Sequence, residues 1–272
     1  ALKITQITEM MKRAERVLRK ERPDAVLVYG DTNTTLAGAL IGASLNIPIF
    51  HIEAGLRSYD RSMPEEVNRV IADHLSEMLF CPTRQSVKNL KKEGITKGVY
   101  LTGDIMYELA LKMSKIPSKN PNILKRLGLK KKRYILATVH RESNTDVKRN
   151  LASIINALCR IKGTVVFPIH PRTVKMLKRF SLWRLLREAK SIKIVPPLGY
   201  MNMICLEKNA YKIITDSGGV QKEAYFFKVP CITLRNKTEW IETLNGGWNL
   251  LVRPDTDKIL AALKKHKLNG QH

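Results

Sequence analysis

The chain has 272 residues, 44% of them hydrophobic, and its 48 Lys and Arg outnumber its 24 Asp and Glu to give a formal net charge of +24. This length favours two α/β domains, and no apolar run is long enough to cross a bilayer. No secretory signal opens the chain and its four cysteines are scattered without paired spacing, so we expect a cytoplasmic protein with reduced thiols and no membrane partner.

The positive charge is concentrated in two stretches. Residues 112–133 carry nine Lys or Arg and no acid, and residues 172–193 carry eight against the single Glu188. Neither stretch interleaves aromatic residues on which bases could stack. We therefore expect solvated helix faces and a basic linker, with weak, salt-sensitive binding to polyanions and no specific nucleic-acid partner.

Apolar segments of strand length alternate along the chain with segments of helical length and period. The predicted strands are 25–29, 47–52, 78–81, 98–102, 134–139, 164–169, 192–195, 211–215, 230–234 and 249–252. The predicted helices include 3–20, 84–93, 146–160 and 219–227. Strands spaced by helices predict parallel sheets built from βαβ units.

The stretch 112–133 interrupts this alternation with Pro117, Pro121 and a run of four basic residues. It predicts a basic linker between two Rossmann-like, doubly wound α/β domains, residues 1–111 and 134–272. A ligand cleft between the domains is the usual companion of this architecture.

Carboxylates follow the first two strands of the amino-terminal half. Asp31 comes directly after strand 25–29, Glu53 after strand 47–52, and Glu65 lies with Glu66 behind Pro64 at the start of a helix. Asp31 could cap a helix and the two glutamates suit a helix dipole. Acids converging on one sheet edge also suit proton abstraction from carbon, since close carboxylates raise one another's pKa.

The carboxyl-terminal half carries the anion-binding features. Ser217, Gly218 and Gly219 join a buried strand to a helix, which presents backbone N–H groups at the positive end of a helix dipole, and Glu223 follows one turn later. Ser217 could also serve only as a helix cap. His140 and Arg141 end strand 134–139 and could neutralise a diphosphate.

His170 ends the next strand, where a histidine is more often a structural residue. No pair of His or Cys has the spacing of metal ligands, so we expect neither a metal nor a cofactor.

Five motifs in register carry a family resemblance. They are Gly30-Asp31-Thr32, His51-Ile52-Glu53-Ala54-Gly55-Leu56-Arg57, Pro64-Glu65-Glu66-Val67-Asn68-Arg69, His140-Arg141 and Thr215-Asp216-Ser217-Gly218-Gly219-Val220-Gln221-Lys222-Glu223. Together they closely resemble the non-hydrolysing UDP-N-acetylglucosamine 2-epimerases, which share the two-domain glycosyltransferase B fold.

The resemblance implies conversion of UDP-GlcNAc to UDP-ManNAc by elimination and re-addition of UDP, for cell-surface polysaccharide synthesis, in a homodimer. It assigns catalytic roles to Asp31, Glu53, Glu65 and His140. It assigns substrate binding to a second set, with Glu223 on the ribose and the serine and glycines on the diphosphate: Arg57, Arg141, Ser217, Gly218, Gly219 and Glu223.

The sequence also departs from the family pattern. The family's opening strand and Gly-Thr-Arg-Pro-Glu loop are not found here, and its crossing helix breaks off after about Lys267. The residues that would hold the uracil are not obvious, given Leu198, Met203 and Trp240. Two alternatives therefore stay open: a hydrolysing relative that releases ManNAc and UDP, and a UDP-sugar-binding fragment without turnover.

Overall fold

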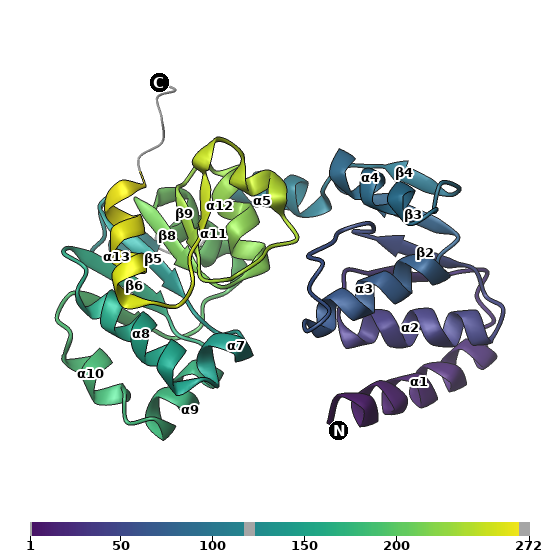
Figure 1. Ribbon diagram of the computed structural model, residues 1–272, viewed down its shortest axis with the longest axis horizontal. Helices are drawn as coiled ribbons and strands as arrows, with labels where there is room; N and C mark the ends of the chain where they lie inside the picture. Colours follow the sequence, from purple (N-terminus) through teal and green to yellow (C-terminus); the bar gives the residue numbers. More distant parts are fainter. Residues whose placement is uncertain (1, 117–122, 267–272) are drawn as a thin grey trace. The chain divides into compact units, whose positions relative to one another are not determined.

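The computed structural model describes residues 2–116 and 123–266 (Figure 1). The chain separates into two compact units, residues 1–105 and 106–272, each built on its own sheet. In the described part of the chain, no helix is both long and apolar enough to cross a membrane.

Unit 1 has a four-stranded parallel sheet in the order β1-β2-β3-β4. Its strands are β1 (Val26–Tyr29), β2 (Ile49–Ile52), β3 (Met78–Cys81) and β4 (Val99–Leu101). Its helices are α1 (Leu2–Glu21), α2 (Asn33–Ser44), α3 (Pro64–Leu75) and α4 (Arg84–Lys92).

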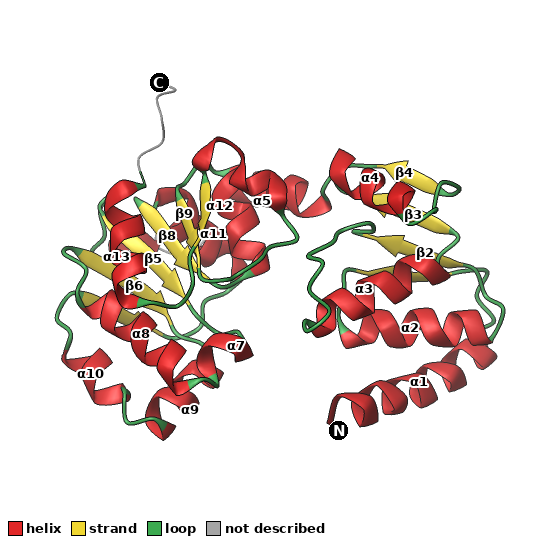
Figure 2. Ribbon diagram, viewed as in Figure 1, coloured by secondary structure: helices red, strands yellow, loops and turns green. Residues whose placement is uncertain are grey.

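The helices of unit 1 gather on one face of this sheet. Helix α2 packs against Val28 and Ile49, and α4 packs its Leu90 against Leu79 of β3. Helix α1 packs on α2 and not on the sheet (Figure 2). Because β1 and β2 turn into their helices on the same side, the residues that follow them meet at one end of the sheet.

The opposite face of the sheet is apolar and partly open. Leu27 and Tyr29 of β1 are 47% and 56% exposed, and Tyr100 of β4 is 48% exposed. Among the described residues no helix seals this face, and β1 forms the edge of the sheet. A parallel sheet is ordinarily covered on both faces, so unit 1 lacks part of the burial that stabilises such a sheet.

Unit 2 has a six-stranded parallel sheet in the order β10-β9-β8-β5-β6-β7. Its strands are β5 (Tyr134–Thr138), β6 (Thr164–Pro168), β7 (Ile192–Val195), β8 (Lys212–Thr215), β9 (Cys231–Thr233) and β10 (Asn249–Leu251). Its helical elements are α5 (Ile105–Lys115), α6 (Ile123–Arg126), α7 (Glu142–Thr145), α8 (Lys148–Cys159), α9 (Pro171–Arg179), α10 (Trp183–Glu188), α11 (Tyr200–Asn209), α12 (Gly218–Phe226), the 3-10 helix η1 (Ile241–Gly247) and α13 (Thr256–Lys265).

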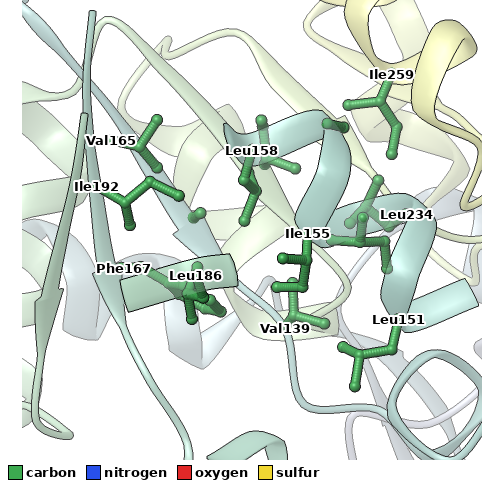
Figure 3. Close-up of a cluster of buried hydrophobic side chains, with 14 of the residues drawn as sticks. Val139, Leu151, Ile155, Leu158, Val165, Phe167, Leu186, Ile192, Leu234 and Ile259 are labelled. Atoms are coloured by element: carbon green, nitrogen blue, oxygen red, sulfur yellow. The ribbon is translucent and has the colours of Figure 1, made fainter. Parts of the chain in front are cut away.

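Helices cover both faces of this second sheet. One cluster joins β6 to α8, α9, α10 and α13, and in Figure 3 Ile155 and Leu158 of α8 lie over Val165 and Phe167 of β6. On the other face α6, α11 and α12 pack against Leu136 and Val166. The chain leaves β5 for β6 on one side and returns to β8 on the other, so the strand order reverses between β5 and β8. Ligands of doubly wound sheets bind at such a reversal.

The prediction of two parallel α/β sheets is confirmed. Each of the ten predicted strands forms, and the predicted helices 3–20 and 84–93 form with ends shifted by a residue. The predicted segment 146–160 contains α8, preceded by the separate short helix α7. The predicted linker contains the end of α5 and all of α6, while its residues 117–122 lie outside the described part, as does the chain after residue 266.

We predict that unit 1 of this chain opens more readily than unit 2. Its sheet has an exposed apolar face and an unpaired edge strand, so local opening there exposes little further apolar surface. Hydrogen exchange measured by mass spectrometry or NMR should be faster in β1 and β2 than in β5 and β8. Equal protection in the two sheets would contradict this expectation.

Candidate functional site

The ends of β5 and β8 lie side by side where the strand order of unit 2 reverses. Thr138 pairs with Thr215 in the register of the sheet, and their hydroxyl oxygens are 2.6 Å apart. Thr215 Oγ1 also accepts from the backbone N–H of Ser217 at 2.9 Å. These hydrogen bonds therefore join the two loops at the points where they leave the strands.

Asp216 holds the loop after β5 against the loop after β8. Its carboxylate is fully buried and accepts from the backbone N–H groups of His140 at 3.1 Å and Arg141 at 3.0 Å, and from Asn144 Nδ2 at 3.0 Å. Because Arg141 is the residue immediately before α7, the carboxylate also lies at the positive, amino-terminal end of that helix. Hydrogen bonds to a charged group each contribute about 1.5–3 kcal/mol, so this contact fixes His140 and Arg141 beside the glycine loop.

Ser217 caps the helix that follows β8. Its Oγ accepts from the Val220 N–H at 3.3 Å, as the capping interpretation of the sequence expected. Gly218 and Gly219 lie in the first turn of α12, where backbone N–H groups have no acceptor within the helix. A Cβ on Gly219 would meet only Ser217 Oγ, at 3.9 Å, so the space above this glycine is open.

Two guanidinium groups converge on Gly218. A Cβ on this glycine would lie 3.7 Å from Arg141 Nη2, 3.9 Å from Arg235 Nη1 and 3.1 Å from Glu239 Oε1. Arg235 is buried and pairs with Glu239 at 2.7 Å. The helix start therefore combines backbone N–H donors with the Arg141 guanidinium and with Arg235, whose charge is paired with Glu239. Backbone N–H groups at a helix start and guanidinium groups are the donors that bind phosphate.

Arg235 is a residue that sequence reasoning missed. It lies two residues beyond β9, at the same carboxyl edge of the sheet as His140 and Ser217, and this strand-end position is the signal that could have identified it. Gln221 holds its loop in place, because Gln221 Oε1 accepts from Thr238 Oγ1 at 3.0 Å and from Asn249 Nδ2 at 3.1 Å. In the same loop Trp240 is buried beneath Lys222, whose Nζ is 3.6 Å from the ring centroid.

Glu223 is buried on the second turn of α12 and approaches two other acidic side chains. Its Oε1 has no hydrogen-bond partner among the described residues. Glu223 raises the pKa of Tyr200, after the larger effect of burial, and does the same to Glu207. No cation is paired with the Glu223 carboxylate in the described contacts, and its Oε1 is enclosed by the protein.

His140 is a partly buried imidazole above Asp216. Burial lowers its pKa below the ordinary 6.5, Asp216 opposes this shift, and His170 and Arg141 add to it. Its Nδ1 lies 3.3 Å from Asp216 Oδ1, and its ring centroid is 5.8 Å from that of His170. His170 caps α9 by accepting from the Arg172 N–H at 3.1 Å, which confirms the structural interpretation of that histidine.

In unit 1, Asp31 lies where β1 ends and forms an ion pair with Arg69. The same guanidinium donates from Nη1 to Glu66 Oε2 at 2.7 Å. Glu66 is buried and accepts from the backbone N–H groups of Ser58 and Tyr59, at 2.9 and 2.8 Å, so it anchors the loop before α3. Glu65 lies beside it, half-buried, in the first turn of α3.

Glu53 follows β2 at the same end of the sheet as Asp31. The Gly30 N–H donates to Ile52 O at 3.0 Å, which brings the two strand ends together. Glu53 has a φ of 71°, and its N–H and that of Ala54 both donate to Phe80 O at 3.1 Å. A non-glycine residue in the left-handed region is strained, and such strain concentrates at functional sites.

His51 and Arg57 belong to a buried network around Asp73. His51 bridges Asp73 Oδ1 at 2.7 Å and Gly30 O at 2.8 Å. Arg57 donates to Asp73 Oδ2 at 2.6 Å and to both oxygens of Glu93 at 2.6 and 2.7 Å. With its side chain 1% exposed, Arg57 holds the loop that carries Glu53, and its predicted contact with substrate stays a prediction.

The predicted residues thus form two groups. In unit 2 the structure brings together His140, Arg141, Ser217, Gly218 and Gly219, with Glu223 one turn along α12. In unit 1 it brings Asp31 and Glu53 to one sheet edge and places Glu65 on α3. Across residues 2–116 and 123–266, no group of three or more His, Cys, Asp or Glu is arranged to hold a metal ion.

A family model described as UDP-N-acetylglucosamine 2-epimerase matches residues 3–272. The chain belongs to this family. It is 56% identical over 261 residues to a UDP-N-acetylglucosamine 2-epimerase homolog of Methanococcus maripaludis, covering 96% of this chain and 73% of that protein. It is 43% identical to the UDP-2,3-diacetamido-2,3-dideoxy-D-glucuronate 2-epimerase of Pseudomonas aeruginosa, over 94% of this chain and 71% of the relative.

The fold is that of solved epimerases of the family. The structure of Methanocaldococcus jannaschii UDP-GlcNAc 2-epimerase in complex with UDP-GlcNAc and UDP matches with a TM-score of 0.91 at 45% identity, covering 98% of this chain and 75% of that one. The enzyme from Neisseria meningitidis bound to UDP-GlcNAc matches with a TM-score of 0.84 at 31% identity, covering 95% and 72%. The fold and the enzyme class expected from the motifs are confirmed.

We predict that the Gly219→Asp variant of this epimerase loses its response to UDP. The added carboxylate occupies the open space at the helix start and repels phosphate, whereas Gly219→Ala adds only an uncharged methyl group and serves as the matched control. UDP at one hundred times its dissociation constant stabilises a protein by about 2.7 kcal/mol. Thermal melts with and without UDP should show this gain in the wild type and not in the Asp variant. An equal gain in both would contradict the assignment.

We also predict that UDP raises the pKa of His140. The free imidazole is held neutral by burial and by neighbouring cations, and a bound diphosphate beside it favours the charged form. Histidine ring signals followed by NMR against pH should give a pKa below 6.5 without UDP and a higher value with it. A pKa that UDP leaves unchanged would place the phosphates away from this ring.

Proposed function

We propose that this epimerase interconverts UDP-GlcNAc and UDP-ManNAc by elimination and re-addition of UDP. The carrying observation is the convergence of Arg141 and Arg235 on Gly218 at the start of α12. In the proposed reaction the C1–O bond breaks as a base removes the proton from C2, giving a 2-acetamidoglucal and UDP. The UDP oxygen then re-adds at C1 while a proton is delivered to the opposite face of C2.

Unit 2 supplies the group that stabilises the leaving diphosphate. Charge builds on the phosphate oxygen as the C1–O bond breaks, and fixed donors aimed at developing charge contribute most to such a step. Before substrate arrives, Asp216 holds the backbone of Arg141 and Glu239 pairs with the Arg235 guanidinium. We assign the diphosphate to Ser217, Gly218, Gly219 and Arg141, and the ribose to Glu223. We include Arg235 with the diphosphate group because its guanidinium lies near Gly218.

Unit 1 supplies the acid and base for C2. Proton removal and return on opposite faces requires two groups, and Asp31, Glu53 and Glu65 are the carboxylates available at that end of the unit 1 sheet. Glu53 is the strongest candidate for the base, because its backbone is held in a strained conformation. Asp31 is held in place by its ion pair with Arg69.

The nature of the sugar beyond C2 is a separate part of the proposal. Relatives of similar identity are named for UDP-GlcNAc and for a diacetamido uronate. Both are UDP-linked 2-acetamido sugars. The residues described above are proposed to contact the nucleotide and to act at C2, which the two sugars share, so they do not distinguish between them. Homodimer formation and a cytoplasmic location also stay predictions.

We predict that the product carries deuterium at C2 when the reaction runs in deuterium oxide. Abstraction and return of the proton by carboxylates exchanges it with solvent, so one deuteron should appear for each turnover. Mass spectrometry of the products separates the alternatives, because a non-hydrolysing enzyme yields UDP-ManNAc and a hydrolysing one yields free ManNAc with UDP. Full retention of the substrate proton would rule out this mechanism.

Glu53→Gln should lower turnover by roughly a hundredfold or more, because the variant removes the proposed base while keeping its size. UDP affinity should survive, since the nucleotide groups are on the other unit. Glu77→Gln, which changes an acid outside the predicted site, is the matched control for charge. Undiminished turnover in Glu53→Gln would remove this residue from the chemistry.

A further inference from the structure

Glu207 is a buried acid that the function described so far does not use. It lies in the last turn of α11, its side chain is fully buried, and neither carboxyl oxygen has a hydrogen-bond partner among the described residues. An unpaired buried carboxylate costs several kcal/mol, so such a group is retained in the neutral form or has a specific partner. Helix α11 packs against α12, which carries Glu223.

Three side chains that can lose a proton, Tyr200, Glu207 and Glu223, come together where α11 packs against α12. Tyr200 and Glu207 are seven residues apart, two turns of one helix, and therefore share a face. Glu223 from α12 acts on both of them and raises the pKa of each. The Tyr200 hydroxyl, both Glu207 oxygens and Glu223 Oε1 are all buried without a partner in the described structure, so a proton shared among them would satisfy several groups at once.

The proton belongs on Glu207. Burial is the largest cause of its raised pKa, and Glu223 is the second. Glu207 is in the last turn of α11, where the helix dipole disfavours a negative charge. Both oxygens of Glu207 are buried without a partner in the described structure, whereas of Glu223 only Oε1 is, so Glu207 is assigned the proton and becomes the donor.

We propose that Glu207 is a positioning residue: as the neutral acid it donates a hydrogen bond to Glu223 and orients that carboxylate to accept from the two hydroxyls of a ribose. This role rests on the proposed contact of Glu223 with the ribose. The donor occupies Glu223 Oε1, and Oε2 is left for the ligand.

The groups that face Glu207 determine how pH changes its hydrogen bond to Glu223, which should weaken as the pH rises. They are Glu223 from α12, Tyr200 on its own helix, Tyr134 on β5 and Cys231 on β9, and all four are acids. Below its pKa, Glu207 is neutral and donates. As the pH rises through that pKa, Glu207 ionises beside Glu223, the two carboxylates repel, and the grip on the ribose is lost.

The test compares UDP with 2′,3′-dideoxy-UDP, which lacks both ribose hydroxyls, in wild type, Glu207→Gln and Glu207→Leu. Binding constants are measured by calorimetry between pH 6 and pH 9 or so. The glutamine amide still donates, so Glu207→Gln should keep the preference for UDP within about twofold and remove its decline at high pH. Glu207→Leu has no donor, so its preference for UDP should fall about tenfold or more, with dideoxy-UDP binding unchanged.

Each contrary outcome has its own meaning. An unchanged preference in Glu207→Leu, or an equal loss for both ligands, would overturn the positioning role and leave the proposed function standing. A wild type that does not distinguish UDP from dideoxy-UDP would remove Glu223 from the ribose and overturn the role of both glutamates. Failure of the wild type to bind UDP at all would overturn the proposed function itself.

Discussion

Asp216 is the constraint on which the arrangement of loops at the start of α12 depends. Its buried carboxylate takes three hydrogen bonds from the loop after β5 and is itself part of the loop after β8. A reversal of strand order opens a space between neighbouring loops, but it does not decide where their side chains lie. Asp216 does so here, because it fixes the backbone of His140 and of Arg141, and the Arg141 side chain reaches toward Gly218.

The same principle recurs in unit 1, with a different set of partners. Asp73 joins His51, Arg57 and the backbone N–H of Gly55, and thereby holds the loop that carries Glu53. Glu66 anchors the loop before α3, and Arg69 pairs with both Glu66 and Asp31. In both units a fully buried carboxylate organises the loops, and the more exposed polar groups are left for the ligand. Such preorganisation is what makes electrostatic stabilisation effective at the moment of reaction.

Local patterns were enough to predict the strands, the glycine loop and the residues that follow strands. Short apolar runs bounded by polar segments identify buried parallel strands, and ligand groups in this fold class follow strand ends. Features that depend on contacts between distant residues could not be read in this way. The motif that contains Arg57 gave no sign of Asp73 and Glu93, 16 and 36 residues away, which pair with its guanidinium in the fold. Arg235 was overlooked because Gly218, near which its guanidinium lies, belongs to another loop. Glu207 was overlooked because a single acidic residue in a short helix normally lies on the solvent-exposed face.

We propose that the diphosphate binds at the start of α12 to Arg141, whose backbone Asp216 holds, and to Arg235, which pairs with Glu239. Calorimetric titration of UDP and of uridine tests it most directly, in wild type, in Arg141→Gln, in Arg235→Gln and in the surface control Arg184→Gln. The account predicts that each of the first two variants weakens UDP by tenfold or more, on the order of the 1.4 kcal/mol or more expected of a hydrogen bond to a charged group, while uridine binding and the control are unchanged. UDP binding that is unaffected by both variants would contradict it.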